Sequence, residues 1–428
     1  MHQVRLIDKP EYAALSYTWG APIFDHHVIC DGRRLAITAH LDAALRRFRT
    51  TTWWMLWVDA LCIDQINIPE RNYQVPIMKH IYSQASVTSV YLGESCPLHE
   101  EVLKLMQSLM VLAQILQKYS LAELENMETP DVATSRVRDA AIRFIELKRA
   151  GFPGLPEGTT DLMSAGFPHP QHPVWEAMQS LFLRPWFRRM WIIQEVGLSS
   201  DVIAMLGEHR VNWRLVIESM HAYSEGGLGL WNVTTVQDMT AMTEFTKSGD
   251  SVLGLLKVRN YPQCRSLIEL LNYFRKCLCS DPRDKVYALL GLANDQGAHQ
   301  MVSIDYSKSV EAVYLECAEF LVRNGDGIKM LTQAGILQGC NDTSVELSLP
   351  SWVPDRCREM LTPINRWGEL YRAAGETQPD MGVENRGIGL HVKGIRLVGH
   401  SPTAPHNDSR PKALFHLFEL QQQCLMRC

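Results

Sequence analysis

The segment from Trp53 to Gln65 combines a dense apolar run with two carboxylates, Asp59 and Asp64. A run of this kind is typical of a strand that is buried on both faces, within a parallel sheet covered by helices. Because α/β sheets bind their ligands beyond the carboxyl ends of their strands, acids placed there can hold a ligand hydroxyl or shape the loop. We therefore predict a ligand site at this end of the strand, with Asp59 and Asp64 as binding residues.

Both acids also have a structural interpretation. Asp59 lies inside the apolar run and can accept backbone or tryptophan N–H bonds as a brace, which is the commoner role of a buried aspartate. Asp64, together with Gln65, can cap the turn that follows. The ligand-binding and the structural interpretations therefore both stay open at this point.

A second group of chemically capable side chains lies on an amphipathic helix predicted over Trp186–Ser199. Arg188, Trp191 and Glu195 follow one another at offsets of three and four, so they share one helix face. A carboxylate beside an indole and near a guanidinium can favour positive charge on a bound substrate. The alternative is an ion pair between Glu195 and Arg188 on the surface of a packed helix.

Other reactive side chains lack the context that their chemistry needs. Ser16 is not part of a G-x-S-x-G motif, and Cys62 has no histidine paired with it in the sequence. No G-x-G-x-x-G motif follows a strand and no G-x-x-x-x-G-K-[ST] motif occurs, which argues against a dinucleotide fold of the Rossmann type and a P-loop. The cysteines show no zinc-ligand spacing, so we predict no metal and no bound cofactor.

The elements expected around these residues alternate between strands and helices. Such alternation indicates a parallel, doubly wound sheet with helices on both sides, an α/β fold of three layers. Pro76 falls inside the second helix and is expected to kink or restart it. The predicted elements are strands over 13–17, 56–62 and 87–92, helices over 40–48 and 70–85, and a hairpin over 28–37 that turns at Asp31-Gly32.

A strand at 202–206 and a helix that opens at Trp213 complete a first domain, which we place at residues 1–215. This domain carries a Gly- and Pro-rich insertion near 150–173. Residues 216–428 are expected to form a mainly helical companion region. A small β element, predicted as a hairpin over 389–398, lies near its C-terminal end.

Composition narrows the class of protein. The chain has 428 residues, is 46% hydrophobic and carries a formal charge of −5, so no basic excess points to nucleic acid. Eleven cysteines are an odd number without a disulfide framework, which is typical of a reducing compartment. No signal peptide and no apolar run long enough for a membrane span occur, so we expect a cytoplasmic protein.

Several sequence segments together resemble the heterokaryon-incompatibility (HET) domain of fungi. They occur in the order of that family across about the first 200 residues. A later group of segments is similar to the region that commonly follows the domain. The first group is LSYTWG (15–20), LWVDALCIDQ (56–65), ERNYQVPIMKHIYSQA (70–85), VYLG (90–93) and RPWFRRMWIIQEV (184–196); the second is SDPRDKVYALLGLA (280–293), DYSKS (305–309) and LPSWVPD (349–355).

The resemblance implies a role in non-self recognition between fungal strains and in regulated cell death. HET domains are thought to be distant relatives of TIR domains, which have a flavodoxin-like sheet and some of which cleave NAD⁺ with a glutamate on a helix. By that analogy Glu195 is the candidate catalytic residue, and Trp19 can stack on the nicotinamide or another base. Arg188, Trp191 and the two acids would complete the binding site.

Three functions stay open from the sequence. The first is a HET-type signalling protein, triggered by self-association, a separate partner protein or a small-molecule ligand. The second is an NAD⁺ nucleosidase-type hydrolase that uses Glu195, with NAD⁺ as substrate. The third is a metabolic cyclase or isomerase on the same scaffold. None of them calls for nucleic acid or a membrane as partner.

Overall fold

A computed structural model describes most of the chain. The described residues are 2–49, 55–95, 98–129, 135, 138–142 with 145, 163, 166–169, 171–225, 236–263, 265–334, 347–358, 380–384 and 389–393. Met1–His391 form one compact unit, while the second unit, Val392–Cys428, is described only at Val392 and Lys393. The division into 1–215 and 216–428 stays a prediction, and about two thirds of the insertion near 150–173 lies outside the described residues.

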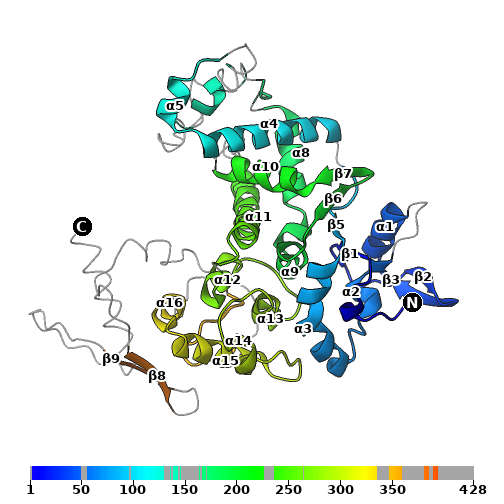
Figure 1. The fold of residues 1–428 in the computed structure, drawn as a ribbon, viewed down its shortest axis with the longest axis vertical. Coiled ribbons are helices and arrows are strands. Elements are labelled where there is room, and N and C mark those ends of the chain that lie inside the picture. The colour runs from blue at the N-terminus through cyan, green and yellow to red at the C-terminus, as the bar shows by residue number, and fades with distance from the viewer. Residues whose placement is uncertain are drawn as a thin grey trace, which may run out of the picture. The chain divides into compact units, whose positions relative to one another are not determined.

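A five-stranded sheet forms the centre of the N-terminal part, which confirms the α/β class (Figure 1). Its first four strands are parallel, and the last pairs antiparallel with its neighbour. Every residue of the second strand in the sheet, AALS, is buried, as expected for a parallel strand covered on both faces. In sheet order the strands are β4 (Leu56–Trp57), β1 (Ala13–Ser16), β5 (Val87–Tyr91), β6 (Val202–Leu206) and β7 (His209–Asn212).

The strand predicted over residues 56–62 is wrong in length and in place. Strand β4 has only two residues and lies at the margin of the sheet, and residues Asp59–Cys62 form a short helix, α2. The Asp59 carboxylate accepts the N–H of Ala60 at 2.7 Å, and the N–H of Cys62 bonds the carbonyl of Val58 at 2.8 Å. An aspartate that bonds its own backbone in this way competes with a strand ladder and favours a helix start. Trp53 lies outside the described residues.

Helices cover both faces of the sheet. Alternate residues of β1 point to opposite faces, so Leu15 joins a small core with Leu41 and Ala44 of helix α1 (Ala39–Phe48). Ala14, on the other face, belongs to the main hydrophobic core. Figure 1 shows β1 and β5 between α1 on one side and α9 on the other.

Helix α3 (Ile68–Gln84) runs through Pro76 as one helix, so the expected restart is absent. Asn67 caps its first turn by accepting the N–H of Glu70 at 3.2 Å, and Pro69 stands in the first turn, where its missing N–H costs nothing. One face of this helix is buried, and its members are Val75, Met78, Ile81 and Tyr82.

The single helix predicted over residues 186–199 is also wrong. A 3₁₀ turn, η2 (Pro185–Arg188), is followed by extended backbone at Arg189, and only then by helix α9 (Ile192–Gly197). The break has a tertiary cause, because Met190 N–H bonds the carbonyl of Leu278 at 2.8 Å and Leu278 N–H bonds the carbonyl of Arg188. This short parallel bridge takes up the backbone groups that a continuous helix would have used.

Helices dominate the described chain outside the sheet, as predicted for the companion region. They are η1 (Leu6–Asp8), α4 (His99–Lys118), α5 (Leu121–Glu125), α8 (Pro173–Phe182), α10 (Trp213–Glu225), α11 (Val236–Asn260), α12 (Leu267–Tyr273), α13 (Asp284–Leu290), α14 (Ala298–Met301), α15 (Val310–Arg323) and α16 (Gly327–Leu331). Within the described residues, no helix combines the length and the apolar character needed to cross a bilayer.

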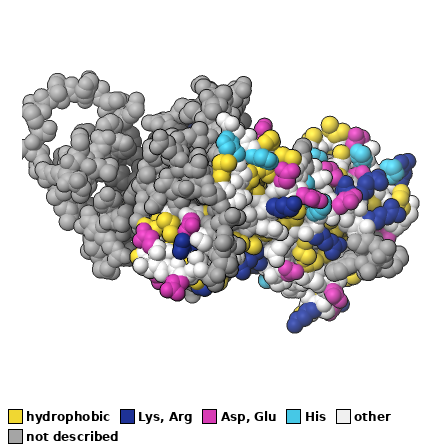
Figure 2. Space-filling view, turned by 90° about the horizontal axis from the view of Figure 1, so that it is seen from above, with side chains coloured by type: hydrophobic (Ala, Val, Ile, Leu, Met, Phe, Trp, Pro, Cys, Tyr) yellow, Lys and Arg dark blue, Asp and Glu magenta, His cyan; other side chains and the backbone are white. Residues whose placement is uncertain are grey.

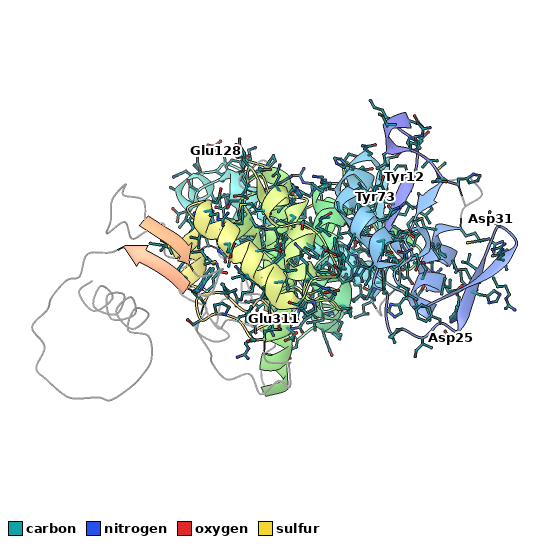
Figure 3. The ribbon with its side chains drawn as sticks, turned by 90° about the horizontal axis from the view of Figure 1, so that it is seen from below. Tyr12, Asp25, Asp31, Tyr73, Glu128 and Glu311 are labelled. Carbon is teal, nitrogen blue, oxygen red and sulfur yellow. The ribbon has the colours of Figure 1, made fainter. Side chains whose placement is uncertain are left out.

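Two small antiparallel sheets accompany these helices. The predicted hairpin is confirmed as β2 (His26–Cys30) and β3 (Arg33–Ile37), which turn at Asp31 and Gly32 with positive φ at both residues. Figure 3 shows Asp25 and Asp31 at this hairpin, far from Glu311 on α15. A small β element is present near the C-terminal end, but it pairs β8 (Asp380–Glu384) with β9 (Gly389–Lys393), so the hairpin predicted over 389–398 is misplaced. Figure 2 shows basic and acidic side chains interspersed over the described part of one face.

Candidate functional site

Ser16, the last residue of β1, lies at the centre of a buried polar cluster. Its hydroxyl donates a hydrogen bond to Glu195 Oε2 and accepts one from Trp186 Nε1 at 2.9 Å. The hydroxyl therefore links the carboxyl end of a central strand to the η2–α9 segment. It is a bonded, positioned group with its donor and its acceptor capacity in use.

Glu195 on α9 is only 1% exposed and makes its main charge contact with Arg189. Arg189 Nη1 bonds Glu195 Oε2 at 3.4 Å, and Arg189 Nη2 lies 3.3 Å from Oε1. Among the described residues, Oε1 has this ion pair but no hydrogen bond of normal geometry. The carboxylate is thus held by one guanidinium and one hydroxyl, out of contact with water.

Asp59 adds a second carboxylate to the same cluster. It accepts the indole N–H of Trp19 at 2.9 Å and is 7% exposed, while Gln65 Nε2 bonds its carbonyl at 3.2 Å. These contacts are those expected for a structural brace. The positive charge of Arg189 acts on Asp59 as well as on Glu195, so one guanidinium serves two buried carboxylates.

Burial controls the charge state of the cluster. It raises the pKa of Glu195 above its ordinary value; Arg189 opposes this increase and Asp59 reinforces it. Burial likewise raises the pKa of Asp59, against Arg189 and the Trp19 hydrogen bond. Tyr17 and Tyr82 also face the cluster, and burial raises the pKa of both phenols. Both tyrosines are therefore neutral at physiological pH.

The six-residue helix α9 is too short to persist alone, so its neighbours must hold Glu195 in place. Arg259 Nη1, from α11, bonds the carbonyls of Val196 and Ser199 at 2.6 and 2.9 Å. Cations near the last carbonyls of a helix satisfy groups that have no partner within the helix. Ser199 Oγ in turn lies 2.6 Å from Thr88 Oγ1 on β5.

Trp19 is the cluster residue with the most exposed ring, at 38%. Its loop is positioned by Gly20, which has a φ of +74° and whose absent Cβ would lie 3.0 Å from the His40 ring. Only glycine adopts this conformation and fits this space without strain. The indole thus has its N–H bonded to Asp59 and a partly open face, which is the arrangement needed to stack on a planar ring.

Three predicted site residues lie elsewhere. Asp64 is exposed and accepts the N–H of Ile66 at 3.1 Å, as a turn residue does. Arg188 pairs with Glu244, and Trp191 donates its indole N–H to Asp284 at 3.0 Å. The expected shared face of Arg188, Trp191 and Glu195 is therefore wrong, because the Leu278 bridge interrupts the helix between them.

Sequence reasoning missed the residues that surround Glu195. Arg189 takes the place beside the carboxylate that was predicted for Arg188. Ser16 was dismissed because it lacks a nucleophile motif, although a single polar residue in a fully buried strand is itself a signal that it has a polar partner. The missed members are Ser16, Tyr17, Tyr82, Trp186 and Arg189.

A second polar network joins this segment to the region that follows. Tyr306 donates to Asp284 Oδ1 at 2.7 Å while Trp191 donates to Oδ2, and burial raises the pKa of Asp284 to about 6. The guanidinium of Arg71, on α3, lies 3.7 Å from the centre of the Tyr306 ring. The SDPRDK and DYSKS motifs thus pack directly on the segment that carries Glu195.

What the clusters can bind is limited by their composition. No group of three or more histidine, cysteine or acidic side chains suited to a metal ion occurs among the described residues. The cluster instead places two buried carboxyl groups and the guanidinium of Arg189 near a partly exposed indole. Such an arrangement can stabilise positive charge on a sugar ring if substrate reaches it.

Comparisons with known proteins agree with these motifs. The family model described as heterokaryon incompatibility protein (HET) matches residues 12–195. The chain is 27% identical over 393 residues to "Heterokaryon incompatibility protein 6, OR allele" of Neurospora crassa. That match covers 81% of this chain and 53% of the relative, so the chain spans about half the length of the curated relative. No solved structure matches.

Proposed function

We propose that this chain, whose residues 12–195 are a heterokaryon incompatibility (HET) domain, acts in fungal non-self recognition and signals regulated cell death. One observation carries the proposal. Segments that are far apart in the sequence but belong to the matched region converge on one buried charged cluster. They contribute Ser16, Asp59, Tyr82, Arg189 and Glu195.

The closed state of this cluster favours signalling over catalysis as its first role. Glu195 is 1% exposed, and its Oε2 receives hydrogen bonds from both Ser16 and Arg189. Buried ion pairs are worth little net stability, but breaking one by removing a partner is costly. We propose that the cluster holds the domain in a resting conformation, and that a trigger acts by opening it.

The trigger in this proposal is contact with a separate protein or with a second copy of the chain. Support comes from apolar side chains that are exposed in and before the β2–β3 hairpin. Ile23, Phe24 and Ile29 are 62%, 61% and 59% exposed. Several large apolar side chains exposed in one short region are typical of a surface that meets a partner.

The strand order supports a finer proposal about the fold. Numbered along the chain, the five strands stand in the order 2-1-3-4-5, which is the order of flavodoxin-like sheets. The antiparallel β7 at the margin is a common addition to such sheets. We propose on this basis that the HET domain is TIR-like.

The same order supports a second candidate function, cleavage of NAD⁺. Ligands of flavodoxin-like sheets bind beyond the carboxyl ends of the strands, at the point where the order reverses beside β1. Ser16 stands at this end of β1, and its hydroxyl bonds Glu195. In an opened cluster, Glu195 would stabilise the positive sugar formed as nicotinamide leaves, and Trp19 would stack on the ring.

Inducible expression of the full chain in a filamentous fungus tests the signalling proposal. We expect growth arrest and dye uptake by dying cells after induction of the wild type, and not after induction of an unrelated protein of similar size. The test is then repeated with co-expression of the protein that corresponds to the Neurospora crassa relative in an incompatible strain. This second arm tests whether cell death requires a partner protein. Normal growth at high levels of folded protein, with and without candidate partners, would remove the proposal.

A matched pair of variants separates signalling from catalysis. Glu195→Gln keeps the shape of the side chain, and Glu208→Gln changes an 83% exposed carboxylate as control. Purified protein is incubated with NAD⁺ and nicotinamide is measured. Release by the wild type and the control but not by Glu195→Gln supports catalysis, whereas cell death without any nicotinamide release leaves signalling alone.

A further inference from the structure

Two arginines that take no part in the cluster of Ser16, Asp59, Arg189 and Glu195 approach each other in the helical region. Arg275 follows helix α12, and Arg356 belongs to the described segment 347–358. Gln333, just after α16, lies between them with 4% of its surface exposed. Arg356 is also only 4% exposed, an unusual degree of burial for a guanidinium.

One neutral oxygen serves both guanidinium groups. Gln333 Oε1 accepts a hydrogen bond from Arg275 Nη1 at 3.4 Å and another from Arg356 Nη1. Two like charges that share a single acceptor must lie close together, and they repel each other. An amide oxygen carries no net charge, so it orients the pair without neutralising it.

Within the described part of the chain, neither arginine has a carboxylate partner. The carboxylate of Asp355 is engaged by Arg358 at 3.1 Å, and Arg275 reaches only the backbone carbonyl of Asp355, at 2.9 Å. Lys285 adds another positive charge, since its Nζ bonds the carbonyl of Arg275 at 2.9 Å. Positive groups therefore exceed negative groups around Gln333.

The electrostatic cost of this arrangement is visible in both arginines. Burial, followed by the charge of Arg356, lowers the pKa of Arg275 to about 9, and burial lowers the pKa of Arg356. Buried charge without a counter-charge is expensive, and proteins retain it where a ligand supplies the missing charge. An anion between the two guanidinium groups would supply the missing counter-charge. It would offset the cost of burying the two charges and reduce the repulsion between them.

A structural explanation accounts for Arg275 but not for Arg356. Arg275 bonds two backbone carbonyls, those of Asp355 and Arg358, and so ties the segment 347–358 to α12. Arg356 makes one hydrogen bond among the described residues, the one to Gln333. A guanidinium has five N–H donors in a fixed planar arrangement. Most of the N–H donors of Arg356 therefore have no hydrogen-bond acceptor among the described residues.

We propose that Arg275 and Arg356 form a binding site for a small phosphate-type anion, either inorganic phosphate or the phosphate group of a phosphomonoester. The paired forks match the tetrahedral oxygens of a phosphate, which arginine binds through parallel N–H···O bonds. The burial of Arg356 restricts the ligand to a small group. The neighbouring Cys357 is exposed, which places the site beside the surface.

Titration of the full-length protein with phosphate tests the site directly. Binding is followed by calorimetry and by the melting temperature, at constant ionic strength adjusted with chloride. We expect saturable binding of inorganic phosphate and a rise in melting temperature that follows the same curve. A parallel titration with glycerol phosphate identifies which of the two sources binds more tightly.

Variants assign the binding to the arginine pair. Arg356→Gln should weaken phosphate binding at least about tenfold, while Arg323→Gln, an arginine whose side chain is 63% exposed, should bind like the wild type. Arg356→Lys keeps the positive charge but loses the planar guanidinium, so it should bind phosphate with intermediate affinity. Because two variants are compared, a folding defect in one of them does not decide the test.

The melting temperature without phosphate provides a second readout. Because Arg356→Gln removes one of two repelling charges, this variant should melt at or above the wild-type temperature in chloride alone and gain nothing from phosphate. Wild-type protein that shows no saturable phosphate binding, or equal binding by wild type and Arg356→Gln, would overturn the proposal. So would an equal effect of chloride and phosphate.

Discussion

Ser16 Oγ donates a hydrogen bond to Glu195 Oε2 across 179 positions of sequence. The bond joins the end of the central strand β1 to the helix α9, and so fixes both ends of the matched HET region to each other. Because Ser16 also accepts the indole N–H of Trp186, its loss would leave that buried N–H without its partner and Glu195 Oε2 with Arg189 alone.

Ser16→Ala should therefore destabilise the protein by about 2 kcal/mol, the cost of leaving buried hydrogen-bonding groups unsatisfied. Urea unfolding followed by circular dichroism measures the change. Ser83→Ala is the matched control, because Ser83 is exposed and its hydroxyl bonds only the carbonyl of His80, at 3.2 Å. The control should change the free energy of unfolding by less than about 0.5 kcal/mol. Equal effects of the two substitutions would contradict the role given to Ser16.

Gly20→Ala should destabilise the Trp19 loop for two separable reasons. A side chain at a φ of +74° is strained, and its Cβ would approach the His40 ring to 3.0 Å. Gly325 also has a positive φ, but a Cβ added there would meet nothing within 4 Å. Gly325→Ala therefore measures the cost of backbone strain alone. We expect a cost of about 1 kcal/mol for Gly325→Ala and a larger one for Gly20→Ala. Unfolding curves of the two variants check this, and a cost at Gly20 no greater than at Gly325 would remove the steric argument.

Asp284 predicts a pH dependence of stability. Burial raises its pKa in the folded state to about 6 from an ordinary value of 3.8, so the folded protein binds this proton more tightly than the unfolded chain does. Its contribution is thus fully present below pH 3.8 and is lost as the pH rises through about 6. The raised pKa values of Asp59 and Glu195 act in the same direction.

The comparison of wild type with Asp284→Asn at pH 4 and pH 7 isolates this residue. The substitution should cost about 2.5 kcal/mol more at pH 4 than at pH 7, given a pKa difference of roughly two units. An Asp284→Asn cost that is the same at both pH values would mean that the folded-state pKa of Asp284 is not raised.

The sequence predicted the sheet better than the segments that build the cluster. Strands β1, β5 and β6 were predicted close to their observed bounds, because each follows a short run of small apolar or β-branched residues. The run from Leu56 to Cys62 was equally apolar, yet there an aspartate that bonds its own backbone replaces most of the strand by α2. A short apolar run does not by itself distinguish a strand from a buried helical turn.

The neighbour of Glu195 could not be predicted from helical periodicity. Arg188 stood at the correct offset for a continuous helix, but pairing with the distant Leu278 interrupts that helix and brings Arg189 to the carboxylate instead. No local pattern encodes a backbone bridge to a residue so far along the chain. The hydrogen bond from Trp19 to Asp59 agrees with the structural interpretation of Asp59 from the sequence, since a buried aspartate near tryptophans requires N–H donors.

A double-mutant cycle between Arg189 and Glu195 tests the central claim, that these two residues form a buried charge pair beside Ser16 and Asp59. Urea unfolding is measured for the wild type, Arg189→Met, Glu195→Gln and the double variant. A matched control cycle uses Arg188→Met in place of Arg189→Met. The account predicts a coupling free energy of about 1–3 kcal/mol for Arg189 with Glu195, and less than about 0.5 kcal/mol for Arg188 with Glu195. Strong coupling of Glu195 to Arg188, or none to Arg189, would contradict it.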